Sequence, residues 1–205
     1  MRSAAKMRAT DADGNVAIPV YAKSDSSVIV TSTHAGRLGE VGPLDDDSGQ
    51  LFSEKGECMG FEDRAKQLGI EFTDDAPQAY LNMAARIGDT IYTSGHVSTQ
   101  KGKLGADVTV EQGYAAAKEV AIAILKSVHQ EVGSLDNLRV VKLFGCVNST
   151  LDFTDQHLVI NGASDLLHEI FGKQGRGFHA RSAVGFAQLP TGVAVEIEAV
   201  FSVEP

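Results

Sequence analysis

Residues 179–203 have the sequence HARSAVGFAQLPTGVAVEIEAVFSV, in which two stretches of alternating character flank Leu189-Pro190-Thr191-Gly192. Alternation with a period of two is typical of β-strands, and proline and glycine between two such stretches indicate a turn. The segment therefore predicts two antiparallel strands joined as a hairpin.

The register of this hairpin decides which side chains share a face of the sheet. If the turn is symmetric, Arg181, Glu196 and Glu198 lie on one face. The small residues Ala183, Gly185 and Ala187 surround them, and Val184, Phe186, Val195 and Ile197 point to the other face. A slip of one residue would invert the assignment. This register predicts a shallow floor bearing one guanidinium and two carboxylates, with room for a small ligand or a partner subunit.

Toward the N-terminus, periodicity and turn residues predict the other elements. The best marked is a helix at 110–132, where Thr109 and Gln112 have capping-box spacing and Gly133 stands at the expected left-handed cap. The others are a short helix at 62–68 ended by Gly69, strands at 79–87 and 90–97 around Gly88-Asp89, a strand at 139–148, and a helix at 154–171 ended by Gly172. In the strand at 139–148, alternation places Val141, Leu143 and Val147 on one face and Val140, Phe144 and Cys146 on the other.

The order of these elements, β-β-α-β-α-β-β, predicts an α+β domain. Two helices would pack on one face of a mixed or mainly antiparallel sheet, because each helix has one apolar stripe. The other face of the sheet is left bare unless another chain meets it.

The chain has 205 residues, a formal net charge of −9 and 43% hydrophobic residues. This length suits one domain of ordinary size, and no stretch approaches the roughly 20 apolar residues of a membrane span. The balance of 27 acidic to 18 basic residues offers no electrostatic footprint for phosphate backbones, so nucleic acid is not an expected partner. Cys58 and Cys146 fit no disulfide framework, which favours a soluble protein of a reducing compartment.

Residues 1–60 differ from the rest and are expected to be a poorly structured or loosely attached extension before a domain at 61–205. Arg2, Lys6 and Arg8 precede the first acidic residue, as in mitochondrial transit peptides, but Asp11 and Asp13 interrupt the pattern early. A cytoplasmic location is therefore expected, with a mitochondrial one as the alternative.

Most of the polar residues also have a purely structural interpretation. Arg181, Glu196 and Glu198 as cross-strand ion pairs would contribute about 0–1 kcal/mol. Cys146 alternates with apolar neighbours and is expected to be a buried, inert thiol. The six histidines show no metal-ligand spacing, and the glycine-rich loops match neither a phosphate loop nor a dinucleotide fingerprint. Neither a metal nor a cofactor is expected.

Several short motifs together resemble the RidA/YjgF family, the reactive-intermediate deaminases also called L-PSP endoribonucleases. They are Tyr92-Thr93-Ser94-Gly95-His96, Val140-Val141-Lys142 with Asp152-Phe153, Ala180-Arg181-Ser182, Leu189-Pro190 and Val195-Glu196-Ile197-Glu198-Ala199. The resemblance covers residues 61–205 and implies a chorismate-mutase-like fold, assembled as a homotrimer with ligand clefts between subunits. It also implies hydrolysis of 2-imino and enamine acids, of the 2-iminopropanoate and 2-iminobutanoate type, to 2-oxo acids and ammonia without a cofactor.

The resemblance also assigns residues to the site. Arg181 matches the family arginine that holds the substrate carboxylate, a role that suits a guanidinium fork. Glu196 matches the acid that positions or activates the attacking water. Tyr80, Ser94 and Gly95 match residues that line the cleft. Water attack on an electrophilic imine needs mainly orientation and one proton shuttle, which these groups would supply.

Some positions depart from the commonest family pattern. Ala183 stands where deaminase members carry a cysteine, and His96 stands where glutamine is frequent. Either His157 or Asn161 matches a family asparagine. These departures indicate a divergent subgroup, and two other functions stay open. One is a non-catalytic module that binds a small carboxylate, and the other is an endoribonuclease, which the net charge of −9 disfavours.

Overall fold

The computed structural model describes residues 9–10, 16–17, 51–52, 58–73 and 80–204. The chain divides into two compact units, residues 1–41 and 42–205. The first holds the antiparallel pair β1 (Ala9–Thr10) and β2 (Val16–Ala17), and the second begins with the antiparallel pair β3 (Leu51–Phe52) and β4 (Cys58–Met59). Most of the predicted extension lies outside the described residues, so its loose attachment stays a prediction.

The helices of the second unit form where the sequence places them. They are α1 (Phe61–Gln67), α2 (Val110–Val132) and α3 (Gln156–Phe171). At the start of α2 the predicted capping box is present: the Gln112 N–H donates to Thr109 Oγ1 at 3.2 Å, and the Thr109 N–H donates to Gln112 Oε1 at 2.9 Å. Gly133 ends this helix in the left-handed conformation, with a φ of 79°. No helix in the described segments is both long enough and apolar enough to cross a membrane.

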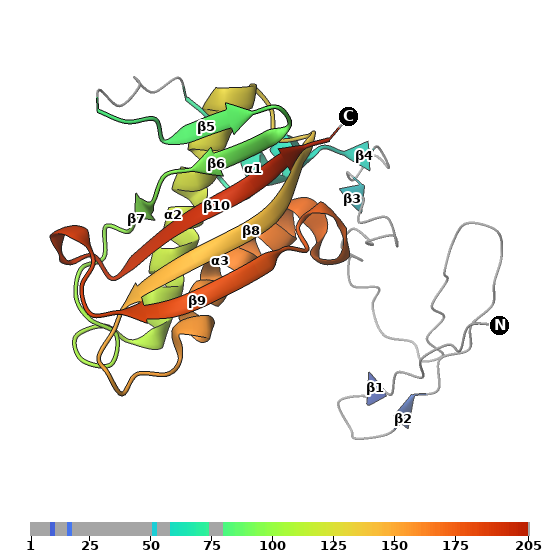
Figure 1. Ribbon diagram of the computed structural model, residues 1–205. Helices are drawn as coiled ribbons and strands as arrows, with labels where there is room; N and C mark the ends of the chain where they lie inside the picture. The colour runs from blue at the N-terminus through green and yellow to red at the C-terminus, as the bar shows by residue number, and fades with distance from the viewer. Residues whose placement is uncertain (1–8, 11–15, 18–50, 53–57, 74–79, 205) are drawn as a thin grey trace. The chain divides into compact units, whose positions relative to one another are not determined.

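One mixed sheet makes up the other layer of this unit (Figure 1). Its strands are β5 (Ala84–Ile87), β6 (Thr90–Thr93), β7 (His96–Val97), β8 (Leu138–Asn148), β9 (Ala180–Phe186) and β10 (Val195–Val203). The order across the sheet is β5-β6-β10-β8-β9, and β7 also pairs with β10. All of these pairs are antiparallel except β8 with β9. The α+β class, the mixed sheet and the first hairpin are thus confirmed.

The predicted hairpin between β9 and β10 is wrong. β8 lies between these strands, so Leu143 of β8 is paired with Arg181 on one side and with Ala199 on the other. Directly paired residues share a face of the sheet, which puts Arg181 on the same face as Leu143 and Ala199. Side chains alternate along β10, so Glu196 and Glu198 project from the opposite face. Arg181 and the two carboxylates therefore do not lie on the same face of the sheet, contrary to the prediction from the sequence.

The segment between β9 and β10 explains why no hairpin forms. It contains a single 3₁₀ turn, η2 (Pro190–Gly192), and the flanking residues Leu189 and Val193 are buried beside Cys146 of β8. These apolar contacts draw the connection across the end of β8 instead of into a tight turn. Adjacent strands lie about 4.8 Å apart, so a connection of this length easily reaches past one strand.

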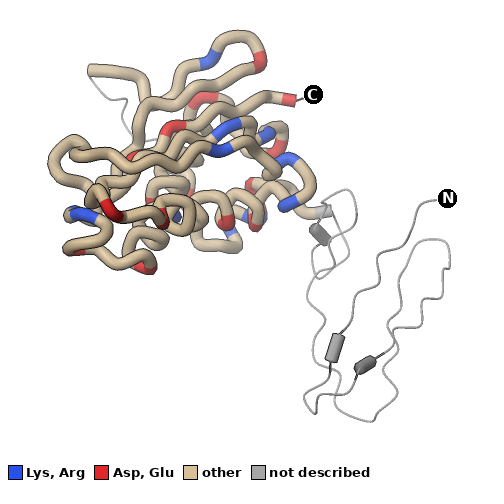
Figure 2. Tube along the Cα trace, turned by 60° about the horizontal axis from the view of Figure 1, so that its bottom comes forward, with Lys and Arg blue, Asp and Glu red and all other residues tan. Residues whose placement is uncertain are grey.

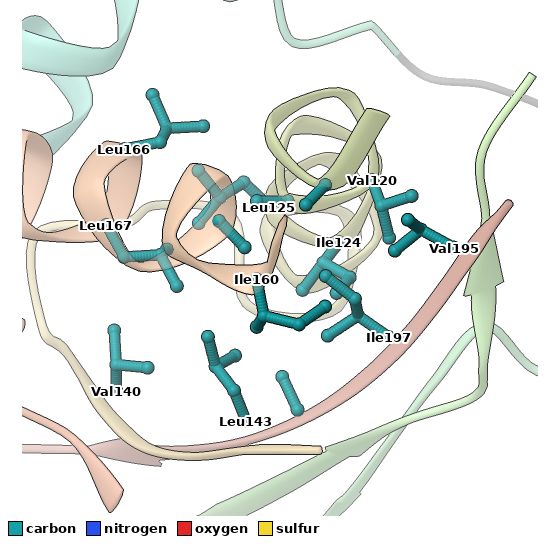
Figure 3. Close-up of a cluster of buried hydrophobic side chains, with 14 of the residues drawn as sticks. Val120, Ile124, Leu125, Val140, Leu143, Ile160, Leu166, Leu167, Val195 and Ile197 are labelled. Carbon is teal, nitrogen blue, oxygen red and sulfur yellow. The ribbon is translucent and has the colours of Figure 1, made fainter. Parts of the chain in front are cut away.

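The sheet face that carries Leu143 is covered by α2 and α3, which pack against each other behind the sheet (Figure 1). Figure 3 shows side chains from both helices, β8 and β10 filling the space between the layers. The labelled residues are at most 2% exposed: Val120, Ile124, Leu125, Val140, Leu143, Ile160, Leu166, Leu167, Val195 and Ile197. Burial of each such side chain contributes about 1.5–3 kcal/mol, so this layer fixes α3 against the sheet.

A β-bulge changes two predicted face assignments in β8. Val200 pairs with Lys142 and Phe201 pairs with Val140, which leaves Val141 as the extra residue. The bulge turns Val140 into the core, at 0% exposure, whereas Val141 is 41% exposed. Strict alternation places Val141 with Leu143 and Val140 with Phe144, and both predictions are wrong because a bulge adds one residue to one strand.

The opposite face of the sheet carries Glu196 and Glu198, and no described helix covers it; we call it the uncovered face. Tyr92 and Val97 lie on it and are 53% and 47% exposed. A bare sheet face agrees with the expectation from the sequence. In the view of Figure 2, Lys and Arg positions are interspersed with Asp and Glu along the described part of the chain and form no continuous basic track.

Candidate functional site

Arg181 lies on β9, the edge strand of the sheet, and its guanidinium reaches toward α3. Nη1 donates to Asn161 Oδ1 at 2.9 Å and to Ser164 Oγ at 3.0 Å. Asn161 and Ser164 stand three residues apart on one helix, so they occupy the same face of α3. Of the two residues that sequence leaves open, the structure therefore places Asn161, and not the exposed His157, against the arginine.

Ser164 also contacts His179. The Ser164 hydroxyl oxygen lies 3.0 Å from Nε2 of His179, and Nδ1 of the same ring lies 2.5 Å from the carbonyl oxygen of Gly177. Burial lowers the pKa of His179 below its ordinary value; the hydrogen bond to the Gly177 carbonyl opposes this shift, and the charge of Arg181 adds to it. The ring of His168 stacks obliquely on His179, with 5.2 Å between centroids. We call Arg181, Asn161, Ser164 and His179 the arginine cluster.

Glu196 lies on the uncovered face, paired with Cys146 of β8 and Val97 of β7. A Cβ atom on Gly95 would stand 2.1 Å from Glu196 Oε1 and 3.0 Å from its Cδ. The carboxylate thus occupies the space that any larger residue at position 95 would fill. Gly95 and Glu196, together with Ser94, form what we call the glutamate cluster.

Ser94 is fixed by hydrogen bonds from three directions. Its N–H donates to the carbonyl of Met83 at 2.9 Å, and its hydroxyl donates to the carbonyl of Asn82 at 2.7 Å. Its own carbonyl lies 2.8 Å from Nδ1 of His96, whose Nε2 lies 2.8 Å from Ser127 Oγ on α2. The backbone at Ser94 and Gly95 is therefore held rigidly between the first hairpin and α2.

Electrostatics set the protonation of the glutamate cluster. Partial burial, and then repulsion from Glu198, raises the pKa of Glu196. Burial and the same two carboxylates raise the pKa of the Cys146 thiol to about 11. Cys146 is also 9% exposed, so the predicted buried thiol is confirmed and it is protonated at neutral pH. Glu196 is the group of this cluster suited to exchange a proton with a ligand.

The arginine cluster and the glutamate cluster lie on opposite faces of the sheet within one chain. The structure brings Ser94, Gly95 and Glu196 together, and separately brings Arg181 against α3. Tyr80 belongs to neither cluster, since its side chain is 96% exposed. Among the described residues, no three His, Cys, Asp or Glu side chains converge in a way that could hold a metal ion.

Comparison with known proteins identifies the family to which this chain belongs. The sequence model of the endoribonuclease L-PSP family matches residues 73–203. The chain belongs to this family. The match spans every residue of the two clusters and excludes α1. The resemblance of the sequence motifs to the L-PSP family, to which RidA and YjgF proteins belong, is thus confirmed.

Individual relatives of this L-PSP family protein cover the same region. Protein TCP17 of Trypanosoma cruzi is 50% identical over 144 residues, which is 66% of this chain and 89% of that protein. A structure from Agrobacterium tumefaciens, of a protein with unknown function, is 37% identical with a TM-score of 0.64 and covers 71% of this chain and 94% of its own. A structure from Shewanella oneidensis, named as a candidate endoribonuclease, is 26% identical with a TM-score of 0.65 and covers 71% and 100%.

Sequence reasoning missed two members of the arginine cluster, Ser164 and His179. The signal for Ser164 was its spacing of three residues from Asn161 on a predicted helix, which places both on one face. For His179 the signal was its position two residues before Arg181, on the same face of a strand. Neither spacing indicates by itself that a helix lies beside that face.

Proposed function

We propose that this protein is a hydrolytic deaminase of 2-imino and enamine acids of the 2-iminopropanoate and 2-iminobutanoate type, releasing 2-oxo acids and ammonia. The observation that carries the proposal is the way Arg181 is held. Its hydrogen bonds to described residues use Nη1 alone, so Nε and Nη2 are left to bind a carboxylate side-on. Asn161 and Ser164 fix the guanidinium before a ligand arrives, which reduces the ordering cost of binding.

The glutamate cluster would supply the proton transfers from a neighbouring chain. In one chain Glu196 lies on the opposite face from Arg181, and the uncovered face is apolar enough at Tyr92 and Val97 to be an interface. A homotrimer that buries this face would bring Glu196 of one subunit near Arg181 of the next. In such a cleft Ser94, Gly95 and Tyr80 would line the ligand site.

The reaction needs one carboxyl group and water. Water adds to C2 of the imine while the Glu196 carboxylate takes a proton, so a C–O bond forms and the C=N π electrons move to nitrogen. The carboxyl then returns the proton to nitrogen, which gives the carbinolamine. The Glu196 carboxylate next takes the proton of the carbinolamine hydroxyl and delivers it to the amino nitrogen, so the C–N bond breaks, ammonia leaves and the C=O bond of the 2-oxo acid forms. The raised pKa of Glu196 favours uptake of the proton from water and lets the same carboxyl return it. No electrons are gained or lost overall.

The test is the rate of 2-oxo acid formation from 2-iminopropanoate generated in situ, measured above the spontaneous hydrolysis. We expect Arg181→Ala to abolish the acceleration, because a charge-assisted pair to a carboxylate contributes about 1.5–3 kcal/mol or more. Arg86→Ala is the matched control, since Arg86 is an exposed arginine that donates to the Gly88 carbonyl in a turn. Equal rates for the wild-type protein and Arg181→Ala would refute the proposal.

Endoribonuclease activity is the second candidate, because the description of the matching family carries that name. The net charge of −9 disfavours it, since RNA binding depends on neutralising phosphates. The deciding assay is cleavage of single-stranded RNA by protein freed of contaminating nuclease, with Arg181→Ala in parallel. Loss of cleavage in the variant, together with no deaminase activity in the wild-type protein, would favour the nuclease. Binding of 2-oxobutanoate without turnover would instead indicate a carboxylate-binding module.

A further inference from the structure

The directions of three linked hydrogen bonds behind Arg181 can be assigned from their chemistry. The Gly177 carbonyl can only accept, so Nδ1 of His179 carries a proton and donates to it at 2.5 Å. Arg181 can only donate, so Ser164 Oγ accepts from its Nη1 at 3.0 Å. The Ser164 hydroxyl hydrogen is therefore free to point to Nε2 of His179 at 3.0 Å, where a neutral ring offers a lone pair.

We propose that Ser164 and His179 are positioning residues, which hold the Arg181 guanidinium in its binding orientation while His179 is neutral. This inference rests on the proposed function, in which Arg181 binds the substrate carboxylate. Ser164 is 5% exposed and His179 is partly buried, so neither touches a substrate in the role assigned to it here. They act through Arg181.

Protonation of His179 would change the direction of the chain of hydrogen bonds. Nε2 would gain a hydrogen and donate to Ser164, so two cationic donors would share the two acceptor lone pairs of Oγ, and the hydroxyl hydrogen would lose its partner. A second positive charge would also stand beside the guanidinium. Both effects push Arg181 away from Ser164, leaving Asn161 as its single partner on α3.

Other charged and titratable side chains lie near this histidine, on α3 and in the turn that follows it. On α3, His168 stacks on His179, and Asp165 lies near His168 and accepts from the Tyr114 hydroxyl of α2 at 3.0 Å. In the turn η1 (Gly172–Arg176), Lys173 adds positive charge near His168. Other cations around this turn, Arg176 and Arg139 of β8, are both paired with Glu204.

The balance of these charges determines the expected direction of the pH effect. Arg181 is the charged side chain that acts directly on His179, and it opposes protonation of the ring, as burial does. The pKa of His179 therefore lies below the ordinary 6.5. His179 is neutral at pH 7 and above, and the arrangement in the structure is lost as the pH falls through that lowered value.

Four variants separate positioning from a merely structural role. His179→Gln keeps an acceptor that can face Ser164 but cannot titrate, whereas His179→Ala and Ser164→Ala each remove one link. His168→Gln is the matched control, because it changes a neighbouring histidine that has no hydrogen bond to Ser164 or Arg181 among the described residues. Circular dichroism and thermal unfolding identify any variant that does not fold.

We expect an acid limb in KM for the wild-type protein: KM should rise on the acid side of about pH 6.5, because His is the side chain that titrates in this range. Protonation of Glu196, whose pKa is raised, would instead lower kcat. His179→Gln should remove this acid limb, and His168→Gln should keep it. His179→Ala and Ser164→Ala should raise KM about tenfold at pH 8, the loss expected for one hydrogen bond to a charged group. An acid limb that persists unchanged in His179→Gln would overturn the proposal.

A measurement without turnover keeps this inference separate from the proposed function. In ¹⁵N NMR, the Arg181 Nε–H resonance should shift with the same midpoint as the His179 ring nitrogens, and the shift should vanish in His179→Gln. If the wild-type protein lacks deaminase activity but these titrations coincide, the proposed reaction fails and the positioning pair stands. If the Arg181 resonance does not follow His179, the positioning pair fails whatever the activity.

Discussion

Gly95 leaves the space that the Glu196 carboxylate occupies, and this pair shows how one missing methyl group shapes the candidate site. The φ angle of Gly95 is not in the left-handed region, so the requirement for glycine comes from space and not from backbone conformation. A Cβ atom 2.1 Å from Oε1 would force the carboxylate to turn, since the backbone at Ser94 is fixed by three hydrogen bonds. The side chain of Glu196 is the movable partner.

We therefore expect Gly95→Ala to lower the deaminase rate at least about tenfold while changing the free energy of unfolding by less than about 2 kcal/mol, because the clash is relieved at a side-chain end. Steady-state kinetics and urea unfolding check the two parts. In a Glu196→Ala background, where no deaminase rate is expected, the same change should lower the free energy of unfolding by almost nothing further, because contacting residues give non-additive effects. Full additivity of the two losses would contradict the direct contact.

The candidate site residues were easier to predict from the sequence than the residues that contact them. Motifs singled out Arg181, Glu196 and Gly95, and the family resemblance kept Asn161 among the candidates; the roles of these residues stay predictions. The shared face of Arg181 and Glu196 was wrong because β-strand alternation fixes faces only relative to a known partner strand. The contact of Ser164 with His179 was not predictable, since it depends on how α3 is rotated against the edge strand.

Between elements, α3 approaches α2 closely at Gly162, one residue after Asn161. A Cβ atom there would stand 2.0 Å from the carbonyl oxygen of Tyr114 and 3.2 Å from the backbone N of Lys118. Both obstacles are backbone atoms of α2, which cannot move aside as a side chain can. This contact sets the depth at which α3 presents Asn161 and Ser164 to Arg181.

We expect Gly162→Ala to lower the free energy of unfolding by about 3 kcal/mol and to weaken substrate binding, because overpacking against backbone displaces α3. Gly113→Ala on α2 is the matched comparison, since there the nearest atoms to a Cβ belong to the side chains of Leu104 and Val159, at 2.9 and 3.1 Å. Both variants gain about 1 kcal/mol of helix propensity, so their difference in urea unfolding isolates the backbone collision. Equal stabilities would contradict it.

Local signals predicted the elements well, and long-range pairing failed. The capping box at Thr109, the cap at Gly133 and the turn at Gly88-Asp89 each depend on neighbours within a few residues, and all are present. The pairing of β9 with β8 depends on a strand about forty positions earlier, and consecutive strands are neighbours only about two-thirds of the time. A hairpin was the statistically favoured interpretation and was wrong for that reason.

At the scale of the whole molecule, the separation of the two clusters is the main consequence of that topology. With β8 between them, the arginine cluster faces the helices at the sheet edge and the glutamate cluster faces the other way. A single chain would then bind a carboxylate without a base, or hold a base without a carboxylate site. The proposed homotrimer resolves this, because each cleft takes one cluster from each of two subunits.

Mixing two inactive variants tests this division between subunits. Arg181→Ala lacks one cluster and Glu196→Gln lacks the other, so each alone should be inactive. After random subunit exchange at equal amounts, a cleft is intact when its arginine comes from the second variant and its glutamate from the first. That chance is one half times one half, so we expect about a quarter of wild-type deaminase activity to return.

Mixing Arg181→Ala with a chain that carries both substitutions should restore nothing, because no chain then supplies Arg181. Light scattering must show the same trimer before and after exchange. An exchanged mixture that stays inactive would contradict a ligand site that takes one cluster from each of two subunits.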